Sequence, residues 1–186
     1  MSRAPQLLLG ALVIAPWLTI TARDMTRATR LGRSHEATAK IGEIIAAVAL
    51  FHRTDGAEGR RCPHPLGQAA GTVGPTPPLS VECHRRPEGQ CRPYLGDGSL
   101  DGPGIYSARL WSTTPMWRAI GFRLLDDHAF HYSLTTRDVD EGCVVEVEAR
   151  ADLDGDGDMS TIQARAHLSP KTAAIDPTWE LRDPLE

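Results

Sequence analysis

Two runs of alternating apolar and polar residues lie in the last third of the chain, on either side of an acidic loop. The apolar positions of the first run, residues 143–150, are Cys143, Val145, Val147 and Ala149, and those of the second, residues 162–168, are Ile162, Ala164, Ala166 and Leu168. Because successive side chains of a strand point to opposite faces, this period of two predicts two half-buried antiparallel strands. Residues 151–161 lie between the two runs, and we expect them to form the loop that connects the two strands.

Shorter segments upstream show the same alternation. Residues 120–125 and 130–134 each place apolar side chains at every second position, and the polar residues 126–128 between them predict a turn. Residues 105–110 fit an edge strand. Together with the strands around the acidic loop, these segments predict a roughly four-stranded antiparallel sheet within residues 105–168. The tail, residues 169–186, contains three prolines and is expected to be irregular, with Trp179 docking it.

A helical pattern precedes the sheet and predicts an α+β fold. Within residues 23–54, the apolar residues recur at helical spacing and Thr54-Asp55-Gly56 is a suitable stop; the apolar positions are Ile41, Ile44, Ile45, Val48 and Phe51. If the helix continues into the apolar run Leu7–Ile20, it covers most of residues 7–52. Pro16 would then mark its weakest point.

The apolar run of residues 7–20 has two interpretations. Its 14 residues suit the apolar part of a signal peptide and are few for a membrane-spanning helix. No small-x-small cleavage site follows, so we expect residues 1–22 to be retained as an anchor rather than removed. The arginines that follow, Arg23, Arg27, Arg30 and Arg33, form a basic face that we expect to be solvated. Arginines next to a membrane span favour the cytoplasmic side, which would place the chain after residue 20 in the cytoplasm. The cysteines favour export of the same part of the chain, so the membrane orientation stays open.

Residues 55–104 are rich in glycine and proline and show no periodic element. Pro75, Pro77 and Pro78 exclude a central strand there. The four cysteines of the chain can pair in three ways, and in an exported domain two disulfides are the expected outcome; they are Cys62, Cys83, Cys91 and Cys143. Zinc is the alternative, because His64 and His84 lie near Cys62 and Cys83, but none of the usual zinc spacings is met.

The acidic loop matches part of a calcium-binding pattern. Its oxygen-bearing residues at alternate positions are Asp152, Asp154, Asp156, Asp158 and Ser160, with Gly157 at the sharp turn. Gln163 stands where such loops carry a bidentate glutamate, and no flanking helices are predicted. We therefore favour a structural Asp-Gly hairpin turn, with a weak Ca²⁺ site as the alternative. No other cofactor is indicated.

Composition narrows the function classes. The 186 residues, 41% of them hydrophobic, suffice for one domain with a core. A net charge of −4 argues against a nucleic-acid partner. No nucleophile–base pairing stands out, so we expect no enzymatic activity and see no evidence of a small-molecule substrate. His128 and His131 would face opposite sides of a strand, and we expect both at the surface.

The order of these features resembles the type IV pilin-like and pseudopilin-like proteins of the myxobacterial kind. The apolar segment with its early proline leads into Ser34-His35-Glu36-Ala37, which is similar to the Ser-Glu-Ala segment of many pilins. The similarity continues through Trp117-x-x-x-Gly121-Phe122, Phe130-His131-Tyr132 and the acidic loop. The prepilin processing motif, a glycine followed by Phe-Thr-Leu-x-Glu, is absent, which favours a divergent member over a major pilin.

The resemblance implies a ladle-shaped subunit. A long N-terminal helix would lie half in the membrane, with its other half packed on the sheet. The implied function is that of a non-enzymatic subunit of a type IV pilus or type II secretion-like machine, with other pilin-like subunits and the membrane as partners. Its location would be the inner membrane, with a periplasmic or extracellular domain. The alternative is a secreted or periplasmic calcium-dependent binding module.

Overall fold

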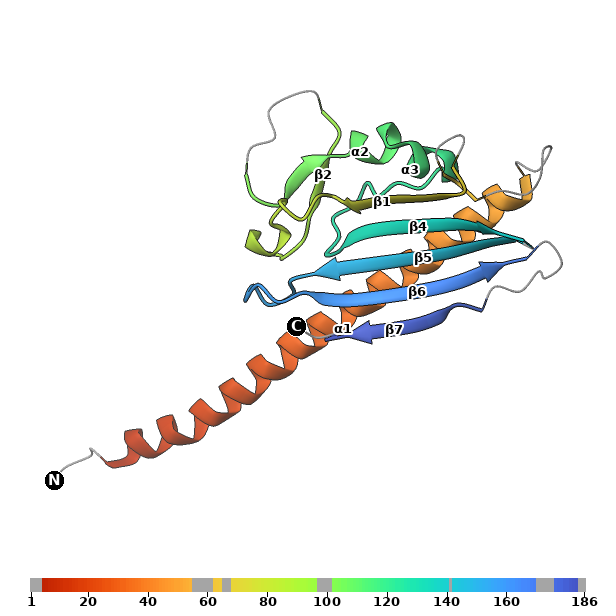
Figure 1. Ribbon diagram of the computed structural model, residues 1–186. Coiled ribbons are helices and arrows are strands. Elements are labelled where there is room, and N and C mark those ends of the chain that lie inside the picture. Colours follow the sequence, from red (N-terminus) through yellow and green to blue (C-terminus); the bar gives the residue numbers. More distant parts are fainter. Residues whose placement is uncertain are drawn as a thin grey trace.

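A long helix crosses one face of an antiparallel sheet in this protein (Figure 1). The computed structural model describes residues 5–54, 62–64, 68–96, 102–140, 142–169 and 176–183, with side chains from residue 28 onward. Helix α1 spans Pro5–Thr54, so the predicted stop at Thr54 is confirmed and the helix continues through Pro16. The α+β fold class is therefore confirmed.

The described part of the main sheet has five antiparallel strands in the order β1-β4-β5-β6-β7. Their bounds are β1 Ala70–Thr76, β4 His131–Val139, β5 Gly142–Ala151, β6 Ser160–Leu168 and β7 Thr178–Arg182. Val147 of β5 pairs with Leu134 of β4 and with Ala164 of β6, which places three buried residues side by side on the inner face. The predicted strands within residues 130–134, 143–150 and 162–168 are confirmed as β4, β5 and β6.

The inner face of the sheet packs against the C-terminal half of α1. The helix residues buried there are Ala37, Ile41, Ile44, Ile45, Val48 and Ala49. Most of these lie three or four residues apart, as the helical pattern predicts. The N-terminal part of α1 projects away from the sheet (Figure 1). The helix therefore has one half inside the folded domain and one half outside it.

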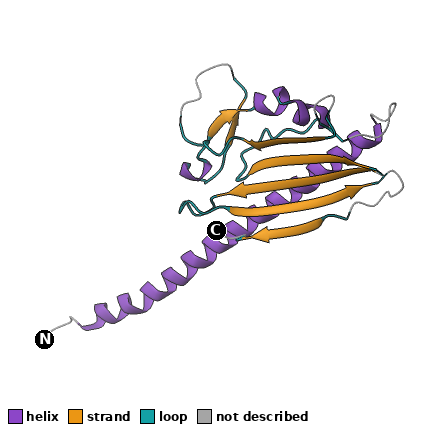
Figure 2. Cartoon of the chain, in the orientation of Figure 1, coloured by secondary structure: helices purple, strands orange, loops and turns teal. Residues whose placement is uncertain are grey.

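A second layer covers the β1 edge of the sheet (Figure 2). It comprises the short helices α2 (Arg109–Thr113) and α3 (Pro115–Ile120) and the small parallel sheet of β2 (Arg92–Tyr94) and β3 (Ile105–Ser107). It also includes the 3-10 turn η2, Cys83–Arg85. Buried rings pack together in this layer: Trp111 lies edge to face with Trp117 and with Phe122, at centroid distances of 5.1 and 5.5 Å. Trp117 and Phe122 are tilted to each other, with centroids 5.7 Å apart.

In this second layer one predicted strand is wrong and another is shorter than predicted. Residues 120–125 contain the last residue of α3, Gly121 in the left-handed conformation at φ 67°, and an irregular segment. The alternation of Ile120, Phe122 and Leu124 arises from residues on either side of this helix cap, not from a strand. In the predicted edge strand 105–110, only Ile105–Ser107 is extended, and α2 follows directly.

Three strands, β1, β2 and β7, were not predicted, and β2 lies in the segment 55–104. The tail expected to be irregular contains β7, which pairs with β6 and places Trp179 opposite Ala164. The glycine- and proline-rich segment contains β1, which pairs only with β4 and so forms one edge of the described sheet. The prediction that the prolines exclude a central strand is thereby confirmed, because Pro75 lies in an edge strand.

Two disulfides tether the segment between the helix and the sheet. Cys62 is bonded to Cys143 at the start of β5, and Cys83 of η2 is bonded to Cys91. The prediction of two disulfides is confirmed, and the structure selects one of the three pairings. Disulfides of this kind indicate an extracytoplasmic protein.

Within the residues that the structure describes, no helix is long and apolar enough to cross a membrane. The side chains of the apolar run 7–20 lie outside that description.

Candidate functional site

The acidic loop is a turn held by one buried carboxylate. Asp152, 8% exposed, accepts hydrogen bonds from the backbone N–H groups of Gly155 (2.6 Å) and Gly157 (3.2 Å). Both glycines have positive φ, 84° and 100°, a conformation that side chains other than glycine adopt at a cost. The loop thus connects β5 to β6 as predicted, and its geometry follows from the Asp-Gly repeats.

Part of the predicted calcium site comes together in this loop. Carboxylate oxygens of Asp152, Asp154 and Asp156 lie within 4.8 Å of one another. Asp158 is outside this group, and its backbone N–H donates to Asp156 Oδ1 at 2.8 Å. Ser160 is fully buried at the start of β6, and its hydroxyl has no hydrogen-bond partner among the described residues. Calcium binding stays a prediction that this arrangement does not test.

Side chains from two other elements contact the acidic loop. Arg30 of α1 forms an ion pair with Asp154 at 3.1 Å, and Arg33 donates to the Leu153 carbonyl at 3.4 Å. His84 Nδ1 of η2 lies 3.5 Å from the Asp152 carboxylate. The expectation that Arg30 and Arg33 belong to a solvated basic face is therefore wrong. They attach the loop to α1 on the N-terminal side of its buried stripe.

Three residues after Arg33 on α1, Glu36 joins the helix to the segment that leads into β4. One Glu36 carboxylate oxygen accepts a hydrogen bond from the Ala129 backbone N–H at 3.0 Å. Burial raises the pKa of Glu36, and Arg33 and Lys40 partly offset that rise. Glu36 therefore connects α1 to the segment before β4 through one hydrogen bond.

A chain of buried hydrogen bonds lies next to Ala129. The Trp111 indole N–H donates to the Tyr106 hydroxyl at 2.8 Å, and that hydroxyl lies 3.4 Å from His128 Nε2. His128 Nδ1 lies 2.9 Å from the Asp126 carbonyl, which can only accept, so Nδ1 carries the hydrogen. Burial lowers the pKa of His128 to about 4 and raises that of Tyr106. Both groups are therefore neutral at pH 7.

This buried chain of hydrogen bonds is closed to solvent. His128 is 2% exposed, Trp111 is 1% exposed, and each hydrogen bond is satisfied within the protein. The expectation that His128 and His131 lie at the surface is wrong, since His131 is only 4% exposed. Sequence alternation places both next to apolar residues, but their burial depends on α2, η2 and the Cys83–Cys91 disulfide, which the pattern does not predict.

The outer face of the sheet carries a shallow groove of mixed charge. It is lined by Glu146, Gln163, Arg165, Thr178 and Glu180, which come from β5, β6 and β7. Glu146 and Glu180 are acidic, Arg165 is basic, and the other two side chains are neutral. The lining includes no cysteine, serine or histidine.

Comparisons of the chain with protein-family models, with curated proteins and with solved structures found no match. The fold itself is a pilin-like arrangement, an N-terminal helix packed on an antiparallel sheet. The N-terminal part of α1 projects from the sheet (Figure 1), and it is the candidate functional surface.

Proposed function

We propose that this protein is a non-enzymatic, pilin-like structural subunit of the cell envelope. It acts through packing of its N-terminal helix with partner subunits of a type IV pilus or type II secretion-like machine. The observation that carries the proposal is the division of α1 into a half that packs on the sheet and a half that projects from it.

The sequence of the projecting half supports this role. It contains the apolar run Leu7–Ile20, which has no acidic or basic residue. Fourteen such residues are costly to leave in water, so they require a membrane or the helices of other subunits. The contacts of Arg30 and Arg33 with the acidic loop support the same division, because they secure the helix where it leaves the domain.

The location proposed for the subunit is the inner membrane, with the sheet and its disulfides outside the cytoplasm. The two disulfides support an oxidising compartment for the domain. The arginines after the apolar run favour the opposite orientation, with the domain in the cytoplasm. In this proposal Arg30 and Arg33 contact the acidic loop of the domain and do not set the orientation of the helix.

A cross-linking experiment in cells tests the proposal. A photo-cross-linking amino acid replaces Leu18 in the projecting half, and the matched control carries it at Glu180 on the outer face of the sheet. We expect Leu18 to form adducts with a second copy or with another pilin-like subunit, identified by mass spectrometry, and Glu180 to form none. Equal adducts at both positions, or none at Leu18, would refute packing through the helix.

A further inference from the structure

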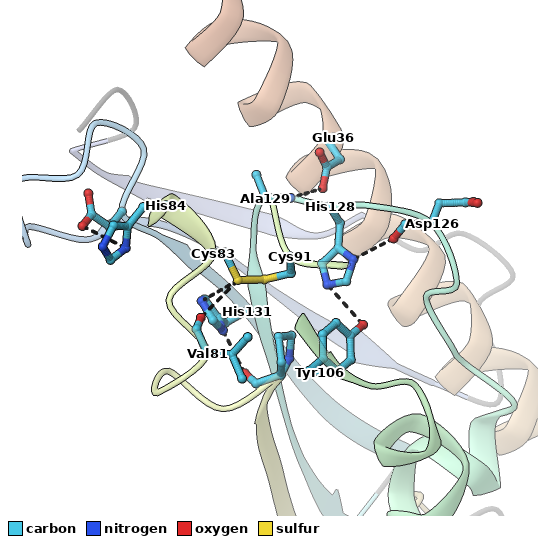
Figure 3. The surroundings of a disulfide bond; sticks show 12 residues. Glu36, Val81, Cys83, His84, Cys91, Tyr106, Asp126, His128, Ala129 and His131 are labelled. Atoms are coloured by element: carbon cyan, nitrogen blue, oxygen red, sulfur yellow. Dashed lines mark hydrogen bonds and ion pairs between the residues drawn. A yellow bond between two sulfur atoms is a disulfide. The ribbon is translucent and has the colours of Figure 1, made fainter. Parts of the chain in front are cut away.

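The buried surroundings of the Cys83–Cys91 disulfide include a histidine that is oriented like a metal ligand (Figure 3). Cys83, Cys91 and His131 are 3%, 0% and 4% exposed, respectively. Their sulfur and ring-nitrogen atoms all lie within 4.8 Å of one another. The three residues come from η2, an isolated bridge and the start of β4, so the fold brings them together from distant parts of the chain.

The hydrogen bonding of His131 fixes which nitrogen faces the sulfur atoms. Its Nδ1 lies 2.9 Å from the Pro77 carbonyl, which can only accept, so Nδ1 carries the hydrogen. The Nε2 atom then presents a lone pair, 3.6 Å from Cys83 Sγ. A disulfide sulfur has no hydrogen to donate, so the contact with Cys83 Sγ does not supply this buried acceptor with a donor in the oxidised protein. A backbone carbonyl on the far nitrogen is the usual support of a metal-bound histidine.

We propose that the reduced pair Cys83 and Cys91, together with His131 Nε2, binds a zinc ion. Two thiolates and one neutral imidazole are ligands that zinc prefers, and three protein ligands leave one coordination position open. Charge favours zinc over a monovalent soft cation. Zn²⁺ balances the two thiolates and leaves a neutral buried site, whereas Cu⁺ would leave a net negative charge away from water.

The metal-bound and disulfide-bonded forms are alternatives that close the same loop. A dithiol reductant breaks the Cys83–Cys91 bond by donating two electrons and two protons, and is itself oxidised to a disulfide. Zn²⁺ then displaces the two thiol protons. Oxidation by a disulfide donor reverses the sequence and releases the ion. The segment between η2 and the bridge at Cys91 is therefore closed covalently in the oxidised chain and by zinc in the reduced chain.

The test uses the purified full-length protein in detergent, reduced with a phosphine without oxygen and then given Zn²⁺. We expect one zinc ion per reduced chain and none per oxidised chain, measured after removal of excess metal. Zinc should protect Cys83 and Cys91 from alkylation while Cys62 and Cys143 react, as mapped by peptide mass spectrometry. Co²⁺ in place of Zn²⁺ should give a thiolate-to-metal charge-transfer band.

Two variants separate this site from incidental binding. His131→Ala should lower zinc affinity at least about tenfold. His84→Ala is the matched control, because His84 is next to Cys83 in sequence but faces Asp152, and it should bind zinc as the wild type does. Absence of zinc binding by the reduced chain, unchanged affinity in His131→Ala, or protection of Cys62 and Cys143 instead would each overturn the proposal. If reduction unfolds the protein, recovery of its circular dichroism by zinc supports the site, and failure to recover overturns it.

Discussion

His128 is a neutral residue of the protein interior, and at the scale of single residues it links stability to pH. Its ring bridges Asp126 and Tyr106, and it lies edge-on to Tyr106 with centroids 5.6 Å apart. Burial is the main cause of its low pKa, and the hydrogen bond to the Asp126 carbonyl partly offsets that lowering. Protonation would place a charge where water cannot reach it.

We predict that His128 makes the protein less stable as pH falls below neutral. Its pKa is about 4 in the folded protein and 6.5 in the unfolded chain, so between these values only the unfolded chain takes up the proton. The free energy of unfolding should therefore decrease as the pH falls from 7 to 4, by about 3 kcal/mol. Urea unfolding at a series of pH values measures this loss.

The variant His128→Gln provides the comparison, because it cannot titrate in either state. Its free energy of unfolding should vary less with pH than that of the wild type over the same interval. His131, whose pKa burial also lowers, remains in both proteins, as does Glu36, whose raised pKa acts with the opposite sign. Parallel pH curves for the two proteins would contradict a neutral buried His128.

At the scale of elements, α1 contributes to the core through one stripe only. Ile44 is fully buried against the sheet, whereas Leu50, six residues on, is 61% exposed. Both are apolar helix residues in the described half of α1, so they form a matched pair for measuring what the packing contributes.

We predict that Ile44→Ala lowers the free energy of unfolding by about 2–5 kcal/mol, because it leaves a cavity between the helix and the sheet. Leu50→Ala should change it by less than about 0.5 kcal/mol, since its side chain is already largely in water. Chemical denaturation of the two variants measures both. Similar losses would show that α1 is not packed on the sheet through the stripe described above.

The two disulfides should contribute unequally to stability. Cys62 and Cys143 are 81 residues apart in sequence, and Cys83 and Cys91 are 8 apart. Because the longer loop loses more entropy in the unfolded chain, replacing both members of the first pair by alanine should cost about 4.5 kcal/mol, and of the second about 2.6 kcal/mol. Denaturation under oxidising conditions measures the order, and a larger loss for the second pair would contradict it.

Regular periodicity made β5, β6 and the C-terminal half of α1 predictable from the sequence. Their apolar positions recur because one face of each is buried against the others. Strands β1 and β7 lie at the two edges of the described sheet, where glycine, proline and exposed residues are tolerated. β1 carries no two-residue period of apolar residues, and β7 is only five residues long, with Trp179 and Leu181 both exposed. The alternation of Ile120 and Phe122 suggests a strand, but Ile120 is the last residue of α3 and Gly121 caps that helix, so the alternation crosses a helix end.

The candidate sites were less predictable than the fold, since they depend on contacts distant in sequence. The Asp-Gly spacing indicated the turn at Asp152, but not that Arg30 would pair with Asp154, a contact spanning 124 positions. The cysteine count indicated two disulfides, but the position of His131 beside Cys83 required the pairing of β1 with β4 and the path of η2. No spacing rule relates residues 83, 91 and 131.

At the scale of the whole molecule, the projecting half of α1 is what distinguishes this protein from a self-contained domain. The described domain buries its own apolar stripe and is closed by two disulfides. The apolar run of residues 7–20 belongs to the part of the helix that the domain leaves uncovered. Whether the mature protein keeps this run decides between a helix-packed envelope subunit and a free module.

The mature N-terminus, determined by intact mass and terminal sequencing of the protein from fractionated cells, tests this claim most directly. We predict an uncut chain, or one trimmed only before Leu7, in the membrane fraction. A new terminus beyond Ile20 in the soluble fraction would contradict the pilin-like proposal. The secreted or periplasmic calcium-dependent module would then be the hypothesis to pursue.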